Sequence, residues 1–444
     1  MHRALPGFRE FYPADCALRN HIFATFRRVV RRFGFEEFDG PTLEPLELFT
    51  EKSGQEIASQ LFHFEDRGGR AVALRPEMTP TLARMVGARA AGLKRPMRWS
   101  NVGEAFRYER PQKGRLRSFY QMNADLLGVE GAAADGELLL LLLSVLSEFG
   151  LTAEDFHVRI GDRCLWNLFL SQFSLDGVEP VLAAIDRMER EEGTRERLLA
   201  LAPADGAAIW DGISVLRTCH GLDGLRQFFG QFAPLRERAE QRLADWEGLL
   251  ECVAGAGFSP NVSVDLTVVR GLAYYTGFVF EAFERGGEGR ALAGGGRYDD
   301  LVSKLAGTPL PAVGFAIGDV TLANLLVEKQ LVPVYHPRPA VFVLWEGDRH
   351  REGLALVTEL RRHGLAVLWD LSPVSRSLSK QMQRADRSGA IFSLFAAADG
   401  NGPVTLRHME SGEEEKMDRA AAISRLVECH RRPGFTGPDL RQDP

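Results

Sequence analysis

The first hydrophobic pattern in the chain is that of an amphipathic helix. From Asp15 to about Phe35, apolar side chains recur at helical spacing while arginines lie largely on the other faces; the apolar positions are Ile22, Phe23, Phe26, Val29 and Val30. Gly34 suits the end of this helix, and the following run to Pro41 predicts a short extended stretch. The pattern therefore predicts a helix that leads directly into a strand.

Short strand-like runs dominate residues 60–130. The runs LFHFED, AVALRP, RPMRWSNVGEAFRYER and FYQMNADLLG are separated by the turn DRGGR and the polar loop PQKGRLR. This spacing is typical of antiparallel hairpins, whereas a doubly wound sheet alternates strands with long helices. The apolar run from Leu138 to Leu146 is too short to span a membrane and predicts a buried helix.

Helical patterns replace the strands from residue 150 to about 255, which predicts a helical insertion at about 165–255. Strands resume at 260, where NVSVDLTVV and FVFEAF alternate around the turn RGLAYYTG and predict a hairpin. AGGGRYDD follows, and PAVGFAIGDVTLANLL predicts a strand that leads into a helix. The fold expected for residues 1–330 is α+β, an antiparallel sheet flanked by helices and interrupted by the insertion.

A proline-rich linker, VPVYHPRP, precedes a different pattern. The runs AVFVLW, LAVLWDL and AIFSLFAAA predict buried strands, and the segments between them predict helices. Because strand and helix alternate here, residues 338–430 are expected to form a separate α/β domain. Residues 431–444 are expected to be a flexible tail.

Composition adds three constraints. The 444 residues suffice for several domains, and 60 acidic against 54 basic residues give a net charge of −6, so a nucleic-acid partner needs a local basic patch. The five cysteines are scattered without a CxxC pair, which argues against a disulfide framework and a structural zinc site. With no apolar leader at the start of the sequence, these features favour a cytoplasmic protein without a metal site.

The densest charge cluster runs from Arg107 to Arg117, with five bases against one acid. A solvated hairpin loop is the simplest interpretation. Arg107, however, lies in a strand-like stretch, where an arginine without an anionic partner is unfavourable. Since a guanidinium suits a phosphate, the cluster also predicts one nucleotide phosphate at Arg107 and a longer polyanion at the loop tip.

Carboxylates elsewhere suggest a polar binding site. Glu77 lies in LRPEMT, and Gln121 precedes Asp125 by four residues, on the same face of a strand. These groups could hold an ammonium or an imidazole, although cross-strand pairs on a surface have the same composition.

Two glycine-containing segments add further candidates. The turn RGLAYYTG brings Arg270 together with Tyr274 and Tyr275, and the GGGR run ends in Gly296 and Arg297. Consecutive glycines permit close backbone approach to a ligand, or form a bulged edge. The chain has no Walker loop, GxSxG, HExxH or post-strand GxGxxG, which weakens hydrolase, zinc-protease and Rossmann interpretations.

A basic stripe marks the C-terminal segment. Lys380, Arg384 and Arg387 lie at i, i+4 and i+7 of a predicted helix, with Arg376 just before it. A solvated helix face and a second nucleic-acid contact both explain this stripe.

Taken in order, these motifs closely resemble the histidyl-tRNA synthetases, a branch of the class II aminoacyl-tRNA synthetases. GFEEFDGPTLE resembles the first class motif, FRYERPQKGRLRSFYQ the second, and PAVGFAIGDVTL the position of the third. LRPEMT and RGLAYYTG resemble the two histidine signatures of this branch, and residues 338–430 resemble its anticodon-binding domain. The likeness runs from about residue 5 to 430.

The resemblance implies an enzyme that activates histidine with ATP to histidyl-adenylate and transfers it to tRNA(His), as a homodimer. It implies Mg²⁺ that comes with ATP and no tightly bound cofactor. Arg107 and Arg270 would be catalytic and would bind ATP together with Gly296 and Arg297. The histidine site would comprise Glu77, Thr79, Gln121, Asp125, Tyr274 and Tyr275. The residues expected to contact tRNA are Arg110, Gln112, Lys113, Arg115, Lys380 and Arg384.

Three positions depart from the family pattern. Thr321 stands where an arginine usually binds the ATP γ-phosphate, Ala273 where aspartate is common, and Asp125 where glutamate is common. Arg297 or Arg84 could replace the missing arginine. The departures leave two alternatives open: the non-charging regulatory subunit of ATP phosphoribosyltransferase, which typically lacks an anticodon-binding domain, and a catalytically inactive RNA-binding paralogue.

Overall fold

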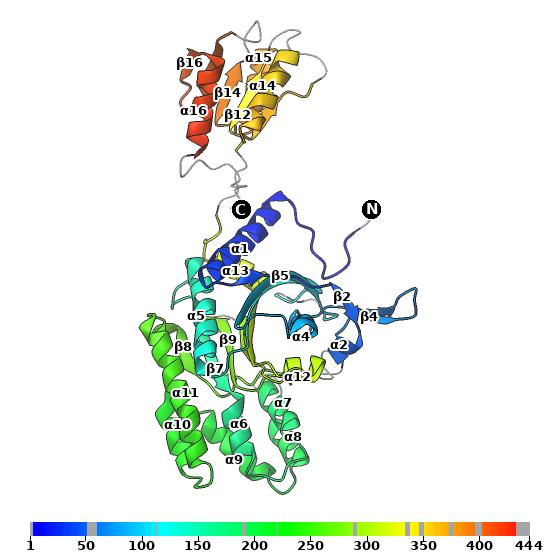
Figure 1. The fold of residues 1–444 in the computed structure, drawn as a ribbon. Coiled ribbons are helices and arrows are strands. Elements are labelled where there is room, and N and C mark those ends of the chain that lie inside the picture. Colours follow the sequence, from blue (N-terminus) through cyan, green and yellow to red (C-terminus); the bar gives the residue numbers. More distant parts are fainter. Residues whose placement is uncertain are drawn as a thin grey trace. The chain divides into compact units, whose positions relative to one another are not determined.

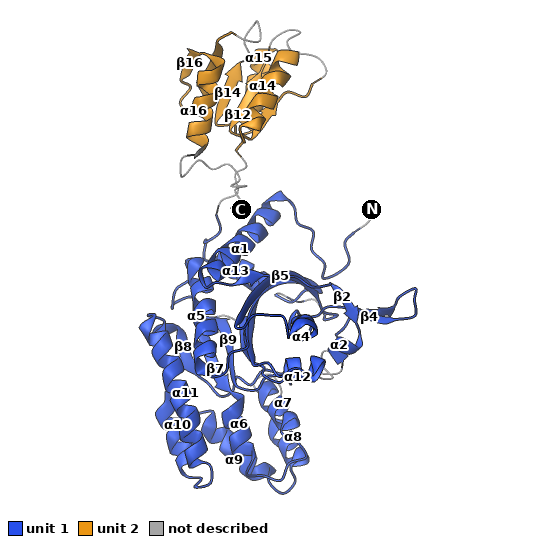
Figure 2. Cartoon of the chain, viewed as in Figure 1, with its two compact units in different colours: residues 1–333 blue, residues 334–444 orange. Residues whose placement is uncertain are grey.

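Two units make up the computed structural model of the chain, residues 1–333 and residues 334–444 (Figure 2). The structure describes residues 3–50, 60–110, 112, 114–188, 192–219, 221–286, 291–333, 338–345, 350–372, 377–395 and 402–431. Lys113, Arg376 and the expected tail from residue 432 onward lie outside these residues. Within the described segments, no helix has the length and apolar content needed to cross a membrane.

An eight-stranded sheet is the centre of the first unit. In spatial order its strands are β1 (Glu36–Glu37), β5 (Met97–Phe106), β6 (Ser118–Leu127), β11 (Ala312–Gly318), β10 (Ala291–Arg297), β9 (Phe278–Glu284), β7 (Phe156–Asp162) and β8 (Val262–Val264). The edge pairs β1·β5 and β7·β8 are parallel, and every pair between them is antiparallel. The predicted α+β fold with an antiparallel sheet is confirmed.

Helices α1 (Pro13–Arg32), α5 (Ala132–Glu148) and α13 (Asp319–Glu328) cover one face of this sheet (Figure 1). Their apolar faces form the main hydrophobic core with the strands beneath them. The leucine-rich run predicted to be a buried helix lies in α5, where Leu138, Leu141 and Leu142 have no exposed surface. Burial of these side chains is the main source of stability for this face.

The sheet curves around α4 (Thr79–Arg89) on its other face, and α4 packs against α12 (Leu301–Ala306) (Figure 1). A second, three-stranded sheet lies beside α4 and α2 (Glu47–Thr50), with the strand order β2 (Leu43–Pro45), β4 (Ala71–Leu74) and β3 (His63–Glu65). The small core around α4 includes the rings of Tyr274, Tyr275 and Tyr298.

The helical insertion lies between β7 and β8. Its elements are α6 (Arg163–Leu170), α7 (Glu179–Arg187), α8 (Thr194–Leu201), α9 (Gly206–Leu216), α10 (Gly221–Gly230) and α11 (Arg236–Gly255), followed by the 3₁₀ turn η1 (Ser259–Asn261). Phe169 joins α6 to this bundle through ring contacts with Phe228 and Phe232. Asp162 caps α6 by accepting hydrogen bonds from the backbone N–H groups of Cys164 and Leu165.

The predicted hairpin between residues 260–268 and the strand after RGLAYYTG is wrong. β8 ends at Val264 and pairs with β7 in parallel, and β7 separates it from β9 in the sheet. The Asp265 carboxylate accepts hydrogen bonds from the backbone and the hydroxyl of Thr267, which turns the chain out of the sheet. The alternating valines therefore do not continue as one strand.

A five-stranded sheet forms the second unit, with the order β13 (Val367–Trp369), β12 (Val341–Leu344), β14 (Phe392–Phe395), β15 (Val404–His408) and β16 (Glu414–Met417). β12 runs parallel to both of its neighbours, and β15 and β16 are antiparallel additions. The helices of this unit are α14 (His350–Arg362), α15 (Leu378–Arg387) and α16 (Arg419–Arg431). The predicted C-terminal α/β fold is confirmed.

Candidate active site

A cavity of about 810 Å³ lies on the face of the eight-stranded sheet that carries α4. Alternate residues of β6 form part of its lining, because side chains two positions apart share one face of a strand; they are Phe119, Gln121, Asn123 and Asp125. The cavity brings together most of the residues predicted from the sequence: Glu77, Thr79, Arg107, Gln112, Arg115, Gln121, Asp125, Arg270, Tyr274 and Tyr275.

Arg107 enters the cavity from the end of the β5–β6 hairpin. Its backbone N–H donates to the Arg117 carbonyl, which continues the hairpin pairing beyond β5. Its Nε donates to the Pro76 carbonyl at 3.1 Å, and its guanidinium carbon lies 5.3 Å from the centre of the Phe119 ring. These contacts hold a cation against the cavity wall.

Arg270 lines the cavity from the turn between β8 and β9, which has unusual backbone geometry. Its φ of +58° lies in the left-handed region, which is disfavoured for residues other than glycine. Its Nη1 donates to Glu281 at 2.9 Å, and its guanidinium carbon lies 5.6 Å from the Tyr275 ring centre. A strained backbone at a cavity wall must be held in place by its surroundings.

The glycines of β10 accommodate protein side chains. A Cβ atom at Gly294 would lie 1.5 Å from Nη1 of Arg270, and one at Gly296 would lie 3.0 Å from the Tyr275 ring. Gly296 does not line the cavity. Gly294 does line the cavity, so the close approach of this glycine run to a ligand stays a prediction, and the missing side chains also make room for Arg270 and Tyr275.

Arg163, at the start of α6, holds the turn that carries Arg270. Its side chain is 2% exposed and donates to the carbonyls of Val269, Arg270 and Leu272 at 3.1, 2.9 and 3.0 Å. An ion pair also joins it to Glu179 in α7. The insertion and the cavity wall are therefore linked through one buried guanidinium.

Replacing Arg163 with methionine is expected to lower the free energy of unfolding by about 2–4 kcal/mol, because one buried and two partly buried carbonyls lose their donor. Chemical denaturation followed by circular dichroism measures this change. Arg226→Met is the matched control, since Arg226 also forms ion pairs within the insertion but is surface-exposed. Equal stability of the two variants would contradict the assigned role of Arg163.

Unpaired polar atoms form part of the cavity lining. Glu77 is 6% exposed, and its Oε2 accepts a hydrogen bond from the Tyr274 hydroxyl at 3.1 Å. Its other oxygen, Oε1, and the Oε1 of Gln121 are buried without a hydrogen-bond partner among the described residues. Burial raises the pKa of Glu77, whereas Arg107 and Tyr274 oppose that rise. Two unpaired acceptors beside one cavity suit a ligand with several N–H donors, such as an ammonium.

Asp125 lies on the same strand face as Gln121 and is 3% exposed. Its Oδ1 accepts a hydrogen bond from the Tyr298 hydroxyl at 2.6 Å, and a Cβ atom at Gly314 would lie 1.9 Å from that oxygen. Burial raises the pKa of Asp125 to about 7, an effect that Tyr298 opposes. The phenol that contacts Asp125 is thus Tyr298, which is not among the histidine-site residues that the resemblance implies.

Neither arginine proposed to replace the one absent at Thr321 lines the cavity. Arg297 is 6% exposed, and it donates to both oxygens of Asp135 in α5, to Asp299 and to the carbonyls of Val129 and Gly131. It follows Gly296 directly, so its side chain extends from the opposite face of β10. The expectation that Arg297 binds a nucleotide is therefore wrong.

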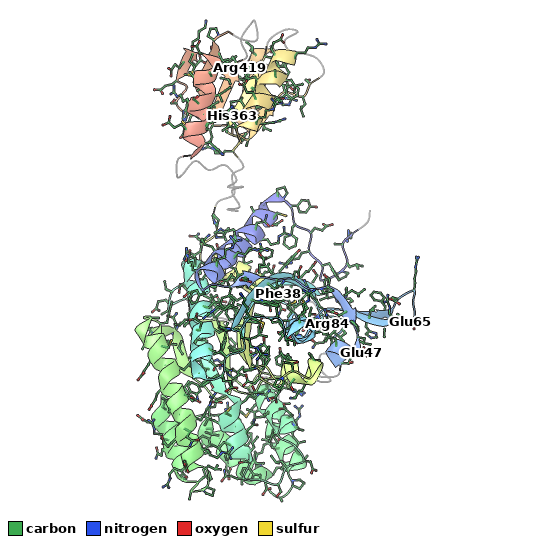
Figure 3. All side chains as sticks on the ribbon, viewed as in Figure 1. Phe38, Glu47, Glu65, Arg84, His363 and Arg419 are labelled. Atoms are coloured by element: carbon green, nitrogen blue, oxygen red, sulfur yellow. The ribbon has the colours of Figure 1, made fainter. Side chains whose placement is uncertain are left out.

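Arg84 is also committed elsewhere. It lies in α4 (Figure 3). Its Nη2 pairs with Oε1 of Glu44 at 2.7 Å. This ion pair fastens α4 to β2, outside the cavity.

The residues expected to contact tRNA are spread over both units. Gln112 and Arg115 face each other across the turn of the β5–β6 hairpin and line the cavity, whereas Arg110 is exposed and does not line it. Lys380 and Arg384 lie on α15 of the second unit, where Arg384 forms an ion pair with Asp370. These assignments remain predictions.

Sequence reasoning missed several cavity residues. Tyr298 follows the GGGR run, Asn123 lies between Gln121 and Asp125 in the same alternation, and Arg159 and Glu281 come from β7 and β9. The period of two in β6 could have revealed Asn123. The others depend on strand order, which no local pattern specifies.

Two family models match the chain. The model described as histidyl-tRNA synthetase matches residues 7–321, and the one described as anticodon-binding domain matches residues 340–429. A histidine–tRNA ligase from Opitutus terrae is 47% identical and covers 94% of this chain and 96% of its own length. One from Haloarcula marismortui is 36% identical, with coverages of 95% and 97%.

Solved structures agree with these matches. Histidyl-tRNA synthetase from Nostoc sp. PCC 7120 has a TM-score of 0.74 at 25% identity and covers 96% of this chain and 99% of its own. A protein from Bacillus halodurans described as an ATP phosphoribosyltransferase regulatory subunit/histidyl-tRNA synthetase has a TM-score of 0.71 at 27% identity, with coverages of 89% and 98%. On the strength of the family model and of relatives that match almost end to end, the chain belongs to the histidyl-tRNA synthetase family.

Proposed function

We propose that the chain is a histidine–tRNA ligase, which converts histidine and ATP to histidyl-adenylate and diphosphate and then transfers the histidyl group to tRNA(His). The observation that carries this proposal is one cavity that combines unpaired acceptors at Glu77 and Gln121 with the cations Arg107 and Arg270. An amino acid offers an ammonium to the first pair, and its reaction with ATP develops negative charge that suits the second.

In the proposed first step, a carboxylate oxygen of histidine attacks the α-phosphorus of ATP, and the bond from that phosphorus to the β-phosphate oxygen breaks. Arg107, just after β5, and Arg270, paired with Glu281 of β9, both line the cavity and would stabilise the charge on the five-coordinate phosphorus. Their fixed positions avoid reorganisation during the reaction. Mg²⁺ would enter as part of the ATP substrate complex.

Histidine would occupy the part of the cavity that Glu77, Gln121 and Asp125 line. Glu77, Thr79, Gln121 and Tyr274 would surround the ammonium, and Asp125 with Tyr298 would bind the imidazole, beside Tyr275. A buried carboxylate and phenol disfavour amino acids that lack matching N–H groups, because their own polar atoms would then remain unpaired.

The tip of the β5–β6 hairpin would contact the acceptor end of tRNA, through residues Arg110, Gln112, Lys113 and Arg115. The second unit, residues 338–430, would bind the anticodon, with Lys380 and Arg384 on its α15 helix. We further propose that residues 1–330 form the catalytic domain, that the protein is a homodimer through the first class motif, and that it works in the cytoplasm.

Replacing Gln112 with alanine is expected to lower the rate of transfer to tRNA(His) at least about tenfold and to change histidine activation less than about twofold. The reason is the position of Gln112 at the hairpin tip, paired with Arg115. Single-turnover transfer from preformed adenylate and pyrophosphate exchange measure the two steps. Gln231→Ala, an exposed glutamine in the insertion, is the control. Equal losses in both steps would contradict the assignment.

The regulatory-subunit alternative is not favoured, because an anticodon-binding domain and an intact second-motif hairpin accompany the synthetase unit. Charging of a tRNA(His) transcript with labelled histidine tests the proposed function. Charging that depends on ATP and fails with other tRNAs supports it. Histidine binding without any charging would support the regulatory alternative.

A further inference from the structure

Arg159 is a cavity residue for which the sequence motifs provide no role. It lies on β7 directly opposite Glu281 of β9, and Glu281 lies opposite Gly294 of β10. Residues opposite each other in a sheet share a face, so Arg159 lies on the cavity face, beside the Arg270–Glu281 ion pair. Among the described residues that line the cavity, it is one of four arginines, with Arg107, Arg115 and Arg270.

Neighbouring groups hold the Arg159 guanidinium in a defined orientation. Its carbon lies 4.2 Å from the centre of the Phe283 ring, and its Nη1 donates to Asp265 at 3.1 Å. The Asp265 carboxylate is itself fixed by two hydrogen bonds from Thr267. The side chain is 24% exposed, so a polar ligand in the cavity can reach it.

Arg159 and Thr321 lie beside the same pair of residues. Phe283, whose ring contacts the Arg159 guanidinium, is opposite Ala291 in the β9–β10 pairing. The Ala291 carbonyl accepts a hydrogen bond from the Thr321 hydroxyl at 3.4 Å. Arg159 thus brings a positive charge to the part of the cavity where position 321 contributes only a hydroxyl.

We propose that Arg159 binds the terminal phosphates of ATP and supplies the charge that position 321 lacks. This inference rests on the proposed function. In the proposed reaction Arg107 and Arg270 flank the α-phosphate. Arg159 lies on the next strand beyond Glu281, a position that suits the β- and γ-phosphates of the same ATP molecule. A guanidinium forms a fork of N–H donors that suits a phosphate, and stacking on Phe283 pre-orients it.

The other arginines are less suited to this role. Arg297 and Arg84 lie outside the cavity in ion pairs with Asp135 and Glu44. Arg115 pairs with Glu109 at 3.0 Å on the hairpin proposed to contact tRNA.

Calorimetric titration of the full-length Arg159→Met protein with ATP and with AMP tests the inference. AMP lacks the β- and γ-phosphates, so we expect the affinity for Mg²⁺–ATP to fall about 10- to 100-fold and that for AMP to change less than about twofold. Arg98→Met is the matched control, because Arg98 also pairs with a carboxylate, Glu137, and lies over a ring, Phe35, but outside the cavity. Unchanged ATP affinity, or equal losses for ATP and AMP, would overturn the inference.

A second substitution tests the equivalence of the two positions. Thr321→Arg added to Arg159→Met is expected to recover at least about tenfold in ATP affinity, and no recovery would overturn the equivalence. Arg159→Lys keeps the positive charge but lacks the fork of N–H donors, so its affinity for ATP is expected to lie between those of the wild type and Arg159→Met. It replaces Arg159→Met in the test if the methionine variant fails to fold. If the wild-type protein activates histidine and Arg159→Met binds ATP with unchanged affinity, only this inference is refuted. If the wild-type protein does not activate histidine, the proposed function itself is refuted.

Discussion

Replacing Arg270 with methionine is expected to slow histidyl-adenylate formation about 100- to 10,000-fold while histidine still binds. Arg270 extends over Gly294 into the cavity, and its orientation is fixed by Glu281 and Tyr275. A charge held in this way requires no rearrangement when the α-phosphorus gains negative charge, so its loss affects the rate more than substrate affinity. Single-turnover kinetics of adenylate formation, with histidine affinity measured separately, distinguish the two effects.

Two further variants make this result interpretable. Arg270→Lys keeps the positive charge without the fork geometry and is expected to recover only part of the rate. Arg285→Met removes an arginine whose hydrogen bonds go to the Ala153 and Pro260 carbonyls, outside the cavity, and is expected to remain active. Near-normal activation by Arg270→Met would exclude the catalytic role.

Replacing Asp125 with asparagine is expected to stabilise the protein at about pH 8 and to weaken histidine binding. Burial raises the pKa of Asp125 from its ordinary 3.8 to about 7, so the folded protein holds this proton more tightly than the unfolded chain. Wild-type stability is then lost as the pH rises from about 4 to about 7, by up to roughly 4 kcal/mol. Asparagine carries no charge and can still accept the Tyr298 hydrogen bond.

The stabilisation by Asp125→Asn should therefore be absent near pH 4 and reach its maximum above about pH 7. In the same variant, the KM for histidine is expected to rise about 10- to 100-fold, whereas the KM for ATP stays constant. Asp155→Asn is a control that is expected to change the stability in the opposite direction. Hydrogen bonds from Thr152 and the contact with Lys329 lower the pKa of Asp155, so its loss should destabilise the protein at high pH. A pH-independent effect of Asp125→Asn on stability would refute the assigned titration.

Local patterns sufficed for much of the fold. The helix α1, the leucine-rich α5 and the β5–β6 hairpin each have a hydrophobic period that tertiary packing reinforces, and all three form where they are predicted. The alternation of strands and helices likewise indicated the separate C-terminal α/β fold. The alternating valines of residues 262–268 gave a wrong prediction because the Asp265 side chain accepts a hydrogen bond from the Thr267 backbone N–H. This bond favours a turn over a continued strand, and hydrophobic spacing does not reveal it.

The candidate site was only partly predictable from the sequence, because strand pairing brings some of its residues together and local spacing does not show that pairing. Residues of β6 could be grouped because their spacing within one strand is local, whereas Arg159 reaches the cavity only because β7 pairs with β9. Arg297 could not be assigned to a face from the sequence, because three glycines precede it and show no alternation. Its partner Asp135 is 162 residues away and comes close only when α5 packs on the sheet.

Histidine-dependent exchange of labelled pyrophosphate into ATP tests the central claim most directly. The assay requires only purified protein, Mg²⁺, ATP and histidine, so it isolates adenylate formation from every contact with tRNA. Robust exchange that requires histidine and disappears in Arg270→Met is the predicted result. Wild-type protein that binds histidine but shows no exchange would contradict the claim that this cavity activates histidine.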